Sequence, residues 1–213
     1  MDEPYFRLLF SPKLEEPVFV EGLPGFGGVG KIASRLLIDS SHAELFAELY
    51  TPWFPDYVTV GKDGICNVPH YEFYAANKKK PHLIILTGNA QPPSEDIKAH
   101  YELCDTILTF AEQHGCKFLL TLDGVPTPRP EGKVYVAATS PKLASEVAEK
   151  GAEVYGHGRI LGATGLLLGF AKNRGLKGIC LLGATSNLRE DREAALSVYN
   201  LLKKILEIKE SSN

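Results

Sequence analysis

The chain has 213 residues, of which 44% are hydrophobic, which suits a packed core and is too many for a disordered chain. The formal net charge of −3 gives no electrostatic reason to expect nucleic acid or an anionic membrane as a partner. No apolar run approaches the roughly 20 residues that cross a bilayer, and the acidic N-terminus lacks the basic segment of a secretory signal. We therefore expect a cytoplasmic protein that folds as a single domain over residues 1–213, with its four cysteines as buried free thiols.

The first third of the chain alternates between strand and helix patterns. Residues 18–23 form a short apolar run that Pro24 and Gly25 end, and residues 28–40 have apolar positions at helical spacing. Residues 43–50 predict a second strand. If both strands share a sheet, this order implies a right-handed parallel crossover.

The middle of the chain interrupts this alternation. Residues 57–68 predict a hairpin, because two β-prone runs flank the turn sequence of residues 61–64. Residues 70–76 predict a further strand. We therefore expect an antiparallel insert at about residues 57–76.

The alternation resumes from residue 82 to the end of the chain. Ser94 is a candidate helix cap, and Ser140 followed by Pro141 is typical of a helix start. Strands are predicted at 82–87, 117–122, 134–139 and 178–182, an irregular loop at 125–132, and helices at 94–113, from 140, at 162–173 and at about 191–208. The pattern predicts a three-layer α/β/α fold with a mixed, mainly parallel sheet.

Residues 25–30 read GFGGVG and match G-x-G-x-x-G between a strand and a helix. Such glycines let backbone N–H groups approach a pyrophosphate. Lys31 extends the likeness toward a P-loop, but Ile32 follows where a magnesium-holding Ser or Thr belongs. The dinucleotide pattern also lacks a clear acidic residue at the end of the second strand. Two interpretations remain open: a sharp turn that permits close helix–sheet packing, or a phosphate or nucleotide site.

Ligands of open α/β sheets bind beyond the carboxyl ends of the strands. These ends supply the candidate ligand residues Gly25, Gly27, Gly28, Gly30, Lys31, Gly88, Asn89, Gln91, Thr185 and Ser186. Asp123 is the only acid directly at such an end, and no serine or cysteine has a recognisable base beside it. The histidines lack metal-ligand spacing. We expect binding rather than catalysis, with no cofactor and no metal.

Aromatic residues concentrate around the antiparallel insert. They are Trp53, Phe54, Tyr71, Phe73 and Tyr74. Most aromatic side chains belong to a core, but tyrosine and tryptophan are also enriched at protein interfaces. These five residues are our candidate interface, and we expect a homo-oligomer.

Residues 21–31, EGLPGFGGVGK, resemble the opening signature of the proteasome assembly chaperone family, in particular its archaeal members related to the second eukaryotic chaperone subunit. The likeness continues in order through residues 43–55, 86–92, 161–169 and 180–186, and so spans nearly the whole chain. The resemblance implies a fold similar to nucleoside phosphorylases, without an established catalytic apparatus. It also implies oligomers and a role in assembling the α-ring of the core proteasome, with proteasome α-subunits as partners.

One departure from the family pattern concerns the C-terminus. Chaperones of this type can end in a hydrophobic-tyrosine-any-residue motif that docks on the α-ring, whereas residues 209–213 read KESSN. We therefore expect any α-subunit contact to use a folded surface. The leading hypothesis is a non-catalytic protein-binding oligomer, and the alternative is a small-molecule or nucleotide-binding enzyme that uses loop 25–31.

Overall fold

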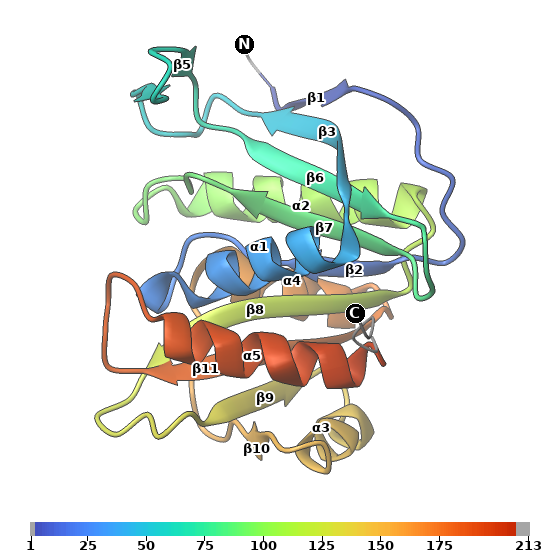
Figure 1. Ribbon diagram of the computed structural model, residues 1–213, viewed down its shortest axis with the longest axis vertical. Coiled ribbons are helices and arrows are strands. Elements are labelled where there is room, and N and C mark those ends of the chain that lie inside the picture. Colours follow the sequence, from blue (N-terminus) through green and yellow to red (C-terminus); the bar gives the residue numbers. More distant parts are fainter. Residues whose placement is uncertain (1–2, 208–213) are drawn as a thin grey trace.

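The computed structural model describes residues 3–207 and contains a nine-stranded sheet with helices on both faces (Figure 1). The sheet order is β1-β3-β6-β7-β2-β8-β11-β9-β10. Its strands are β1 (Tyr5–Leu8), β2 (Val18–Glu21), β3 (Glu44–Tyr50), β6 (Tyr71–Ala76), β7 (Leu83–Gly88), β8 (Phe118–Pro126), β9 (Val134–Ala138), β10 (Glu153–Val154) and β11 (Lys177–Thr185). The helices are α1 (Val29–Ser41), α2 (Ile97–Gln113), α3 (Pro141–Ala148), α4 (Gly162–Asn173) and α5 (Arg192–Ile205).

The centre of the sheet is parallel and its flanks are mixed. Strand β2 pairs in parallel with β7 and β8, and β8 pairs in parallel with β11. On one flank β1, β3, β6 and β7 are antiparallel neighbours, and on the other β11 is antiparallel to β9. The predicted three-layer α/β/α fold with a mixed sheet is confirmed. Strands β2 and β3 do not pair, because β6 and β7 lie between them.

Two apolar cores lie on opposite faces of the sheet. Helices α1 and α5 pack on the face turned to the viewer in Figure 1, and α2 and α4 pack on the far face. One core gathers around Val20, Leu122 and Leu181, whose side chains lie under α1 and α5. The other gathers around Phe19, Phe73 and Leu167. Because neighbouring residues of a strand point to opposite faces, Phe19 and Val20 can anchor different cores.

Several boundaries differ from the sequence prediction for identifiable reasons. Helix α2 begins at Ile97 rather than near Ser94, because the Asp96 carboxylate accepts the N–H of Ala99 at 3.0 Å and so acts as the cap. Strand β8 continues to Pro126, four residues beyond the predicted end, because β11 pairs along its full length. Strands β1 and β10 were absent from the prediction, because both are short edge strands stabilised only by their neighbours.

The predicted hairpin is present as a separate two-stranded ladder of β4 (Thr59–Val60) and β5 (Cys66–Asn67). Its turn is closed by the Gly61 N–H, which donates to the Ile65 carbonyl at 2.9 Å. Cys66 is exposed here, which corrects the expectation of four buried thiols; Cys104, Cys116 and Cys180 are buried. Within residues 3–207, no helix has both the length and the apolar composition to cross a membrane.

Candidate functional site

The glycine-rich loop lies against the carboxyl ends of β2, β8 and β11 and approaches them very closely. A Cβ added to Gly25 would lie 2.1 Å from Oδ1 of Asp123, and one added to Gly30 would lie 2.0 Å from the Leu122 carbonyl oxygen. Both distances are far below any real van der Waals contact. Glycine is therefore required because the loop and the first turn of α1 rest directly on β8.

Two N–H groups of the loop that could otherwise approach a phosphate are bonded to carbonyl groups of the protein. The Gly27 N–H donates to the Leu188 carbonyl at 3.3 Å, and the Gly28 N–H donates to the Gly25 carbonyl at 3.1 Å. Burial raises the pKa of Asp123 to about 6, although hydrogen bonds from the backbone of Gly124 and Phe26 oppose that shift. The loop thus presents bonded donors and a carboxyl group where an anion would have to bind.

Thr185, at the end of β11, joins this closed arrangement. Its hydroxyl lies 2.6 Å from Oδ2 of Asp191, and the other carboxylate oxygen of Asp191 accepts the N–H of Ala194 at 3.0 Å. Asp191 also donates its backbone N–H to the Gly27 carbonyl at 2.8 Å. The contact between loop and β11 therefore starts helix α5, while the neighbouring Ser186 is exposed.

The remaining candidate ligand residues lie in different places and make different contacts. Gln91 donates to the Pro24 carbonyl and so lies beside the loop. Oδ1 of Asn89 accepts the N–H of His70 at 3.3 Å, and Gly88 leaves room for the ring of Tyr71. Lys31 is half-buried on α1, where burial and the positive charge of Arg35 lower its pKa, against the opposing effect of Glu72. The structure brings Gln91 and Thr185 to the loop but turns Lys31 toward β6.

The aromatic candidates also separate into two groups. Tyr71 and Phe73 are fully buried, so the prediction of an interface role is wrong for these two: alternation along β6 turns them inward, toward α2. Trp53 and Phe54 are partly buried and pack against the same core. Tyr74 points to the other face, where its hydroxyl donates to Glu72 at 3.0 Å.

The most unusual polar residue of this region is Glu21, which the sequence analysis did not single out. It is fully buried; Oε1 accepts the Leu23 N–H at 2.9 Å and the Thr164 hydroxyl at 3.4 Å, and Oε2 has no hydrogen-bond partner. Burial, with a smaller contribution from the nearby Asp123, raises the pKa of Glu21 to about 8, although the hydrogen bonds from Leu23 and Thr164 oppose that shift. The sequence signal that could have pointed to a buried carboxyl group is the glutamate that ends the apolar run VFVE.

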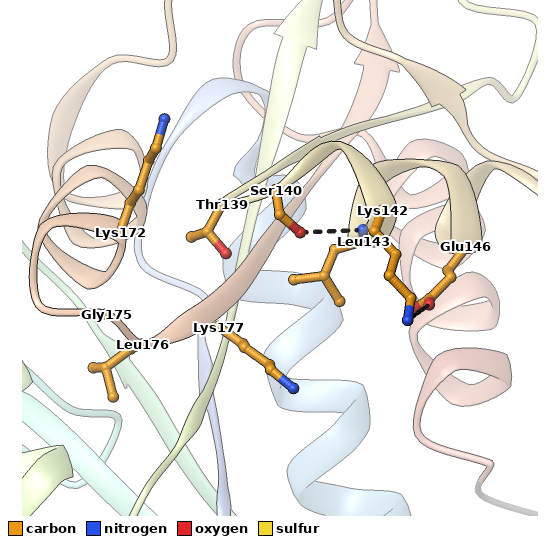
Figure 2. Close-up of a pocket in the computed structure, with 9 residues that line it drawn as sticks. All are labelled: Thr139, Ser140, Lys142, Leu143, Glu146, Lys172, Gly175, Leu176 and Lys177. Carbon is orange, nitrogen blue, oxygen red and sulfur yellow. Dashed lines mark hydrogen bonds and ion pairs between the residues drawn. The ribbon is translucent and has the colours of Figure 1, made fainter.

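Two surface pockets lie away from the loop. The larger, about 350 Å³, is bordered by α3, by the end of α4 and by the start of β11 (Figure 2). Its ammonium groups do not converge: Lys142 lies 3.9 Å from Glu146, and Lys172 points away from the others. The smaller, about 180 Å³, is bordered by β9 and α5. Among residues 3–207, no three His, Cys, Asp or Glu side chains are grouped to hold a metal ion.

The glycine signature therefore has a packing role. The fold and the loop together define a class of three-layer α/β/α proteins in which backbone hydrogen bonds within the chain hold the strand–helix turn. The comparison with known proteins identifies the class more closely. The chain belongs to the PAC2 family, whose pattern matches residues 19–212.

Three similar proteins illustrate this relationship, and two of them have solved structures. PbaB of Pyrococcus furiosus, described as an archaeal proteasome activator, is 35% identical with a TM-score of 0.92, over 99% of this chain and 92% of that one. PbaA of the same organism, described as an archaeal homolog of proteasome-assembly chaperone, is 26% identical with a TM-score of 0.81, over 99% of this chain and 84% of that one. The uncharacterized protein MJ1210 of Methanocaldococcus jannaschii is 38% identical over 87% of this chain and 72% of its own length.

Replacing Gly27 by Ala should destabilise the protein more than replacing Gly28. Both residues have positive φ, 62° and 59°, so both variants lose roughly 1 kcal/mol to backbone strain. Only the new Cβ at Gly27 would lie within 2.8 Å of the Asn187 carbonyl oxygen, and such overpacking costs about 1–3 kcal/mol more. Urea unfolding measures the difference. Equal midpoints for the two variants would show that the loop is not packed as described.

Replacing Glu21 by Gln should stabilise the protein increasingly as the pH rises. Below pH 4.5 the carboxyl is protonated in both states, but between 4.5 and about 8 the unfolded chain loses the proton and the folded chain keeps it. The free energy of unfolding of the native protein therefore falls over this window. The amide mimics the protonated carboxyl and avoids this loss. We expect the gain between pH 5 and pH 8 to exceed about 1.4 kcal/mol, the equivalent of one pKa unit.

The measurement is urea unfolding of both proteins at pH 5, 6.5 and 8. Glu95→Gln, which removes an exposed carboxylate, controls for the change in net charge. A stability difference between Glu21→Gln and the native protein that stays constant with pH would contradict the raised pKa.

Proposed function

We propose that this protein is a non-catalytic, homo-oligomeric chaperone of the cytoplasm that binds proteasome α-subunits. The observation that carries the proposal is the likeness to PbaB along 99% of the chain, at a TM-score of 0.92 and 35% identity. The likeness to PbaA, at 26% identity, supports the same class of partner. A role in α-ring assembly or in proteasome activation fits both relatives.

The geometry of the loop supports binding over catalysis. The loop donors at Gly27 and Gly28 are bonded to carbonyl groups, and Asp123 lies against Gly25. A nucleotide would have to displace these contacts and accept a carboxyl group beside its phosphates. The alternative of a nucleotide-binding enzyme rests on the glycine pattern alone, and the close approach to β8 accounts for that pattern.

The contact with α-subunits should use the folded part of the chain. Residues 209–213, which lie outside the described residues, read KESSN and carry no apolar or aromatic side chain. Ordering such a segment costs conformational entropy that it has little apolar area to offset. We therefore expect the folded surface of residues 3–207, rather than residues 209–213, to supply the recognition.

A purified α-subunit from the same organism should bind this protein with a Kd of about 10 μM or tighter, which corresponds to roughly 7 kcal/mol. A variant that lacks residues 209–213 should bind within about threefold of the intact chain. Isothermal titration of both proteins against the α-subunit measures this. Absence of binding at 100 μM would contradict the proposal. A tenfold loss of affinity on removal of residues 209–213 would show that this segment binds the α-subunit.

Common nucleotides should give no binding heat with this protein. The reason is that the N–H groups of Gly27 and Gly28 are bonded to carbonyl groups and the Asp123 carboxyl group lies against Gly25. The measurement is calorimetry with ATP, ADP and NAD at about 1 mM, with and without magnesium. A Kd in the micromolar range would instead favour the enzyme alternative.

A further inference from the structure

Exposed apolar side chains gather at one end of the molecule. Two segments supply them: β1 with the residues that follow it, and the hairpin of β4 and β5. Their exposed residues are Tyr5, Leu8, Leu9, Phe10, Tyr57, Val58, Val60, Ile65 and Val68. In Figure 1 β1 and the hairpin lie at the top of the molecule, and the chain that follows β1 runs down the right side. A concentration of this kind marks a contact surface, because single proteins in solution rarely leave such apolar groups together and uncovered.

Strand β1 is also an edge with free hydrogen-bonding groups. Among the strands of residues 3–207 it pairs only with β3, in antiparallel orientation. The N–H of Leu9 donates to the Phe46 carbonyl at 2.8 Å. Because backbone groups alternate in direction along such a strand, those of Phe6 and Leu8 point away from β3. A strand with unpaired outward groups is a template for another strand.

The charges near this edge are compatible with contact between identical surfaces. A two-fold contact brings each charge near its own copy, so it is tolerated only where the charges are already neutralised. The Arg7 guanidinium lies 3.3 Å from Glu48, and Glu72 lies 2.5 Å from Arg35 and 3.6 Å from His70. Each acid of this group thus has a basic neighbour within its own chain.

Aromatic rings of this region stack on one another within the chain. The ring of Tyr50 stacks on Tyr5 and on His70, with centroids 5.3 Å apart in each case. On the face turned to the viewer in Figure 1, no helix of residues 3–207 lies over β1 and β3, whereas Arg35 of α1 reaches Glu72 of β6. Ordered aromatic rings at a surface lose little conformational entropy when they are buried by a partner.

We propose that two copies of this chain associate around a two-fold axis, with β1 against β1 in antiparallel orientation and the hairpin of residues 57–68 beside the junction. The opposite edge strand, β10, has only the two residues Glu153 and Val154 and offers little for a head-to-tail contact with β1. This contact specifies the oligomeric part of the proposed function. It does not depend on proteasome binding.

The test compares Leu8→Lys with Val154→Lys by sedimentation velocity at about 1–50 μM. The two residues are matched, since they are 61% and 59% exposed and lie on opposite edge strands. The native chain, 23.3 kDa, should sediment as a dimer or a multiple of it. Lysine at a sheet edge opposes strand addition, so Leu8→Lys should raise the dissociation constant at least tenfold. Val154→Lys should leave it within about twofold.

A second pair of variants keeps the proposal testable if Leu8→Lys disturbs folding, which circular dichroism and urea unfolding would reveal. Val60→Lys in the hairpin should also weaken association, and Leu188→Lys should not; these residues are 62% and 64% exposed. A native chain that sediments at 23 kDa at 50 μM overturns the proposal. So does an oligomer that neither Leu8→Lys nor Val60→Lys weakens. If the variants weaken association but no α-subunit binds, only the functional proposal fails.

Discussion

The contact between the glycine-rich turn and strand β8 is the constraint on which the rest of this structure depends. Gly25 and Gly30 bring the backbone so close to Asp123 and Leu122 that no side chain fits between them. This approach sets the position of α1 on the sheet. It also brings Gly27 to the loop after β11, where the carbonyl of Gly27 accepts the Asp191 N–H and helix α5 begins. One turn thereby orients both helices that cover this face.

The polar groups at the same sheet edge bond to one another and to the backbone. Hydrogen bonds inside the protein satisfy Thr185, Asp191 and Asn89, so these side chains are committed to holding loops together. Glu21 is buried with one oxygen unpartnered, and its pKa is raised to about 8. A neutral carboxyl next to Thr164 links β2 to the first turn of α4 without placing a charge in the core. These polar side chains therefore connect neighbouring strands, loops and helices.

The end of the sheet away from these contacts is more open. On the face that α1 and α5 cover, the sheet extends past these helices at β1 and β3. The hairpin of β4 and β5 projects at the same end. Strands β2, β8 and β11 pair at the centre of the sheet. The end of the sheet at β1 offers the aromatic and apolar side chains typical of contact surfaces.

The sequence by itself determined the fold class, the family and the order of the central elements, because these depend on local periodicity and on short motifs such as EGLPGFGGVGK. It left two interpretations of the glycine loop open, since glycine is needed both for phosphate binding and for close packing. Only the tertiary structure shows the packing role, because it places atoms of Asp123 and Leu122 2.0–2.1 Å from where a Cβ of Gly25 or Gly30 would lie. Burial was equally inaccessible: Tyr71 and Tyr74 are alike in sequence, but the pleat of β6 turns one into the core and the other toward Arg35. The edge strands β1 and β10 escaped prediction because their stability comes from distant partners in the sheet, and a local pattern carries no record of those partners.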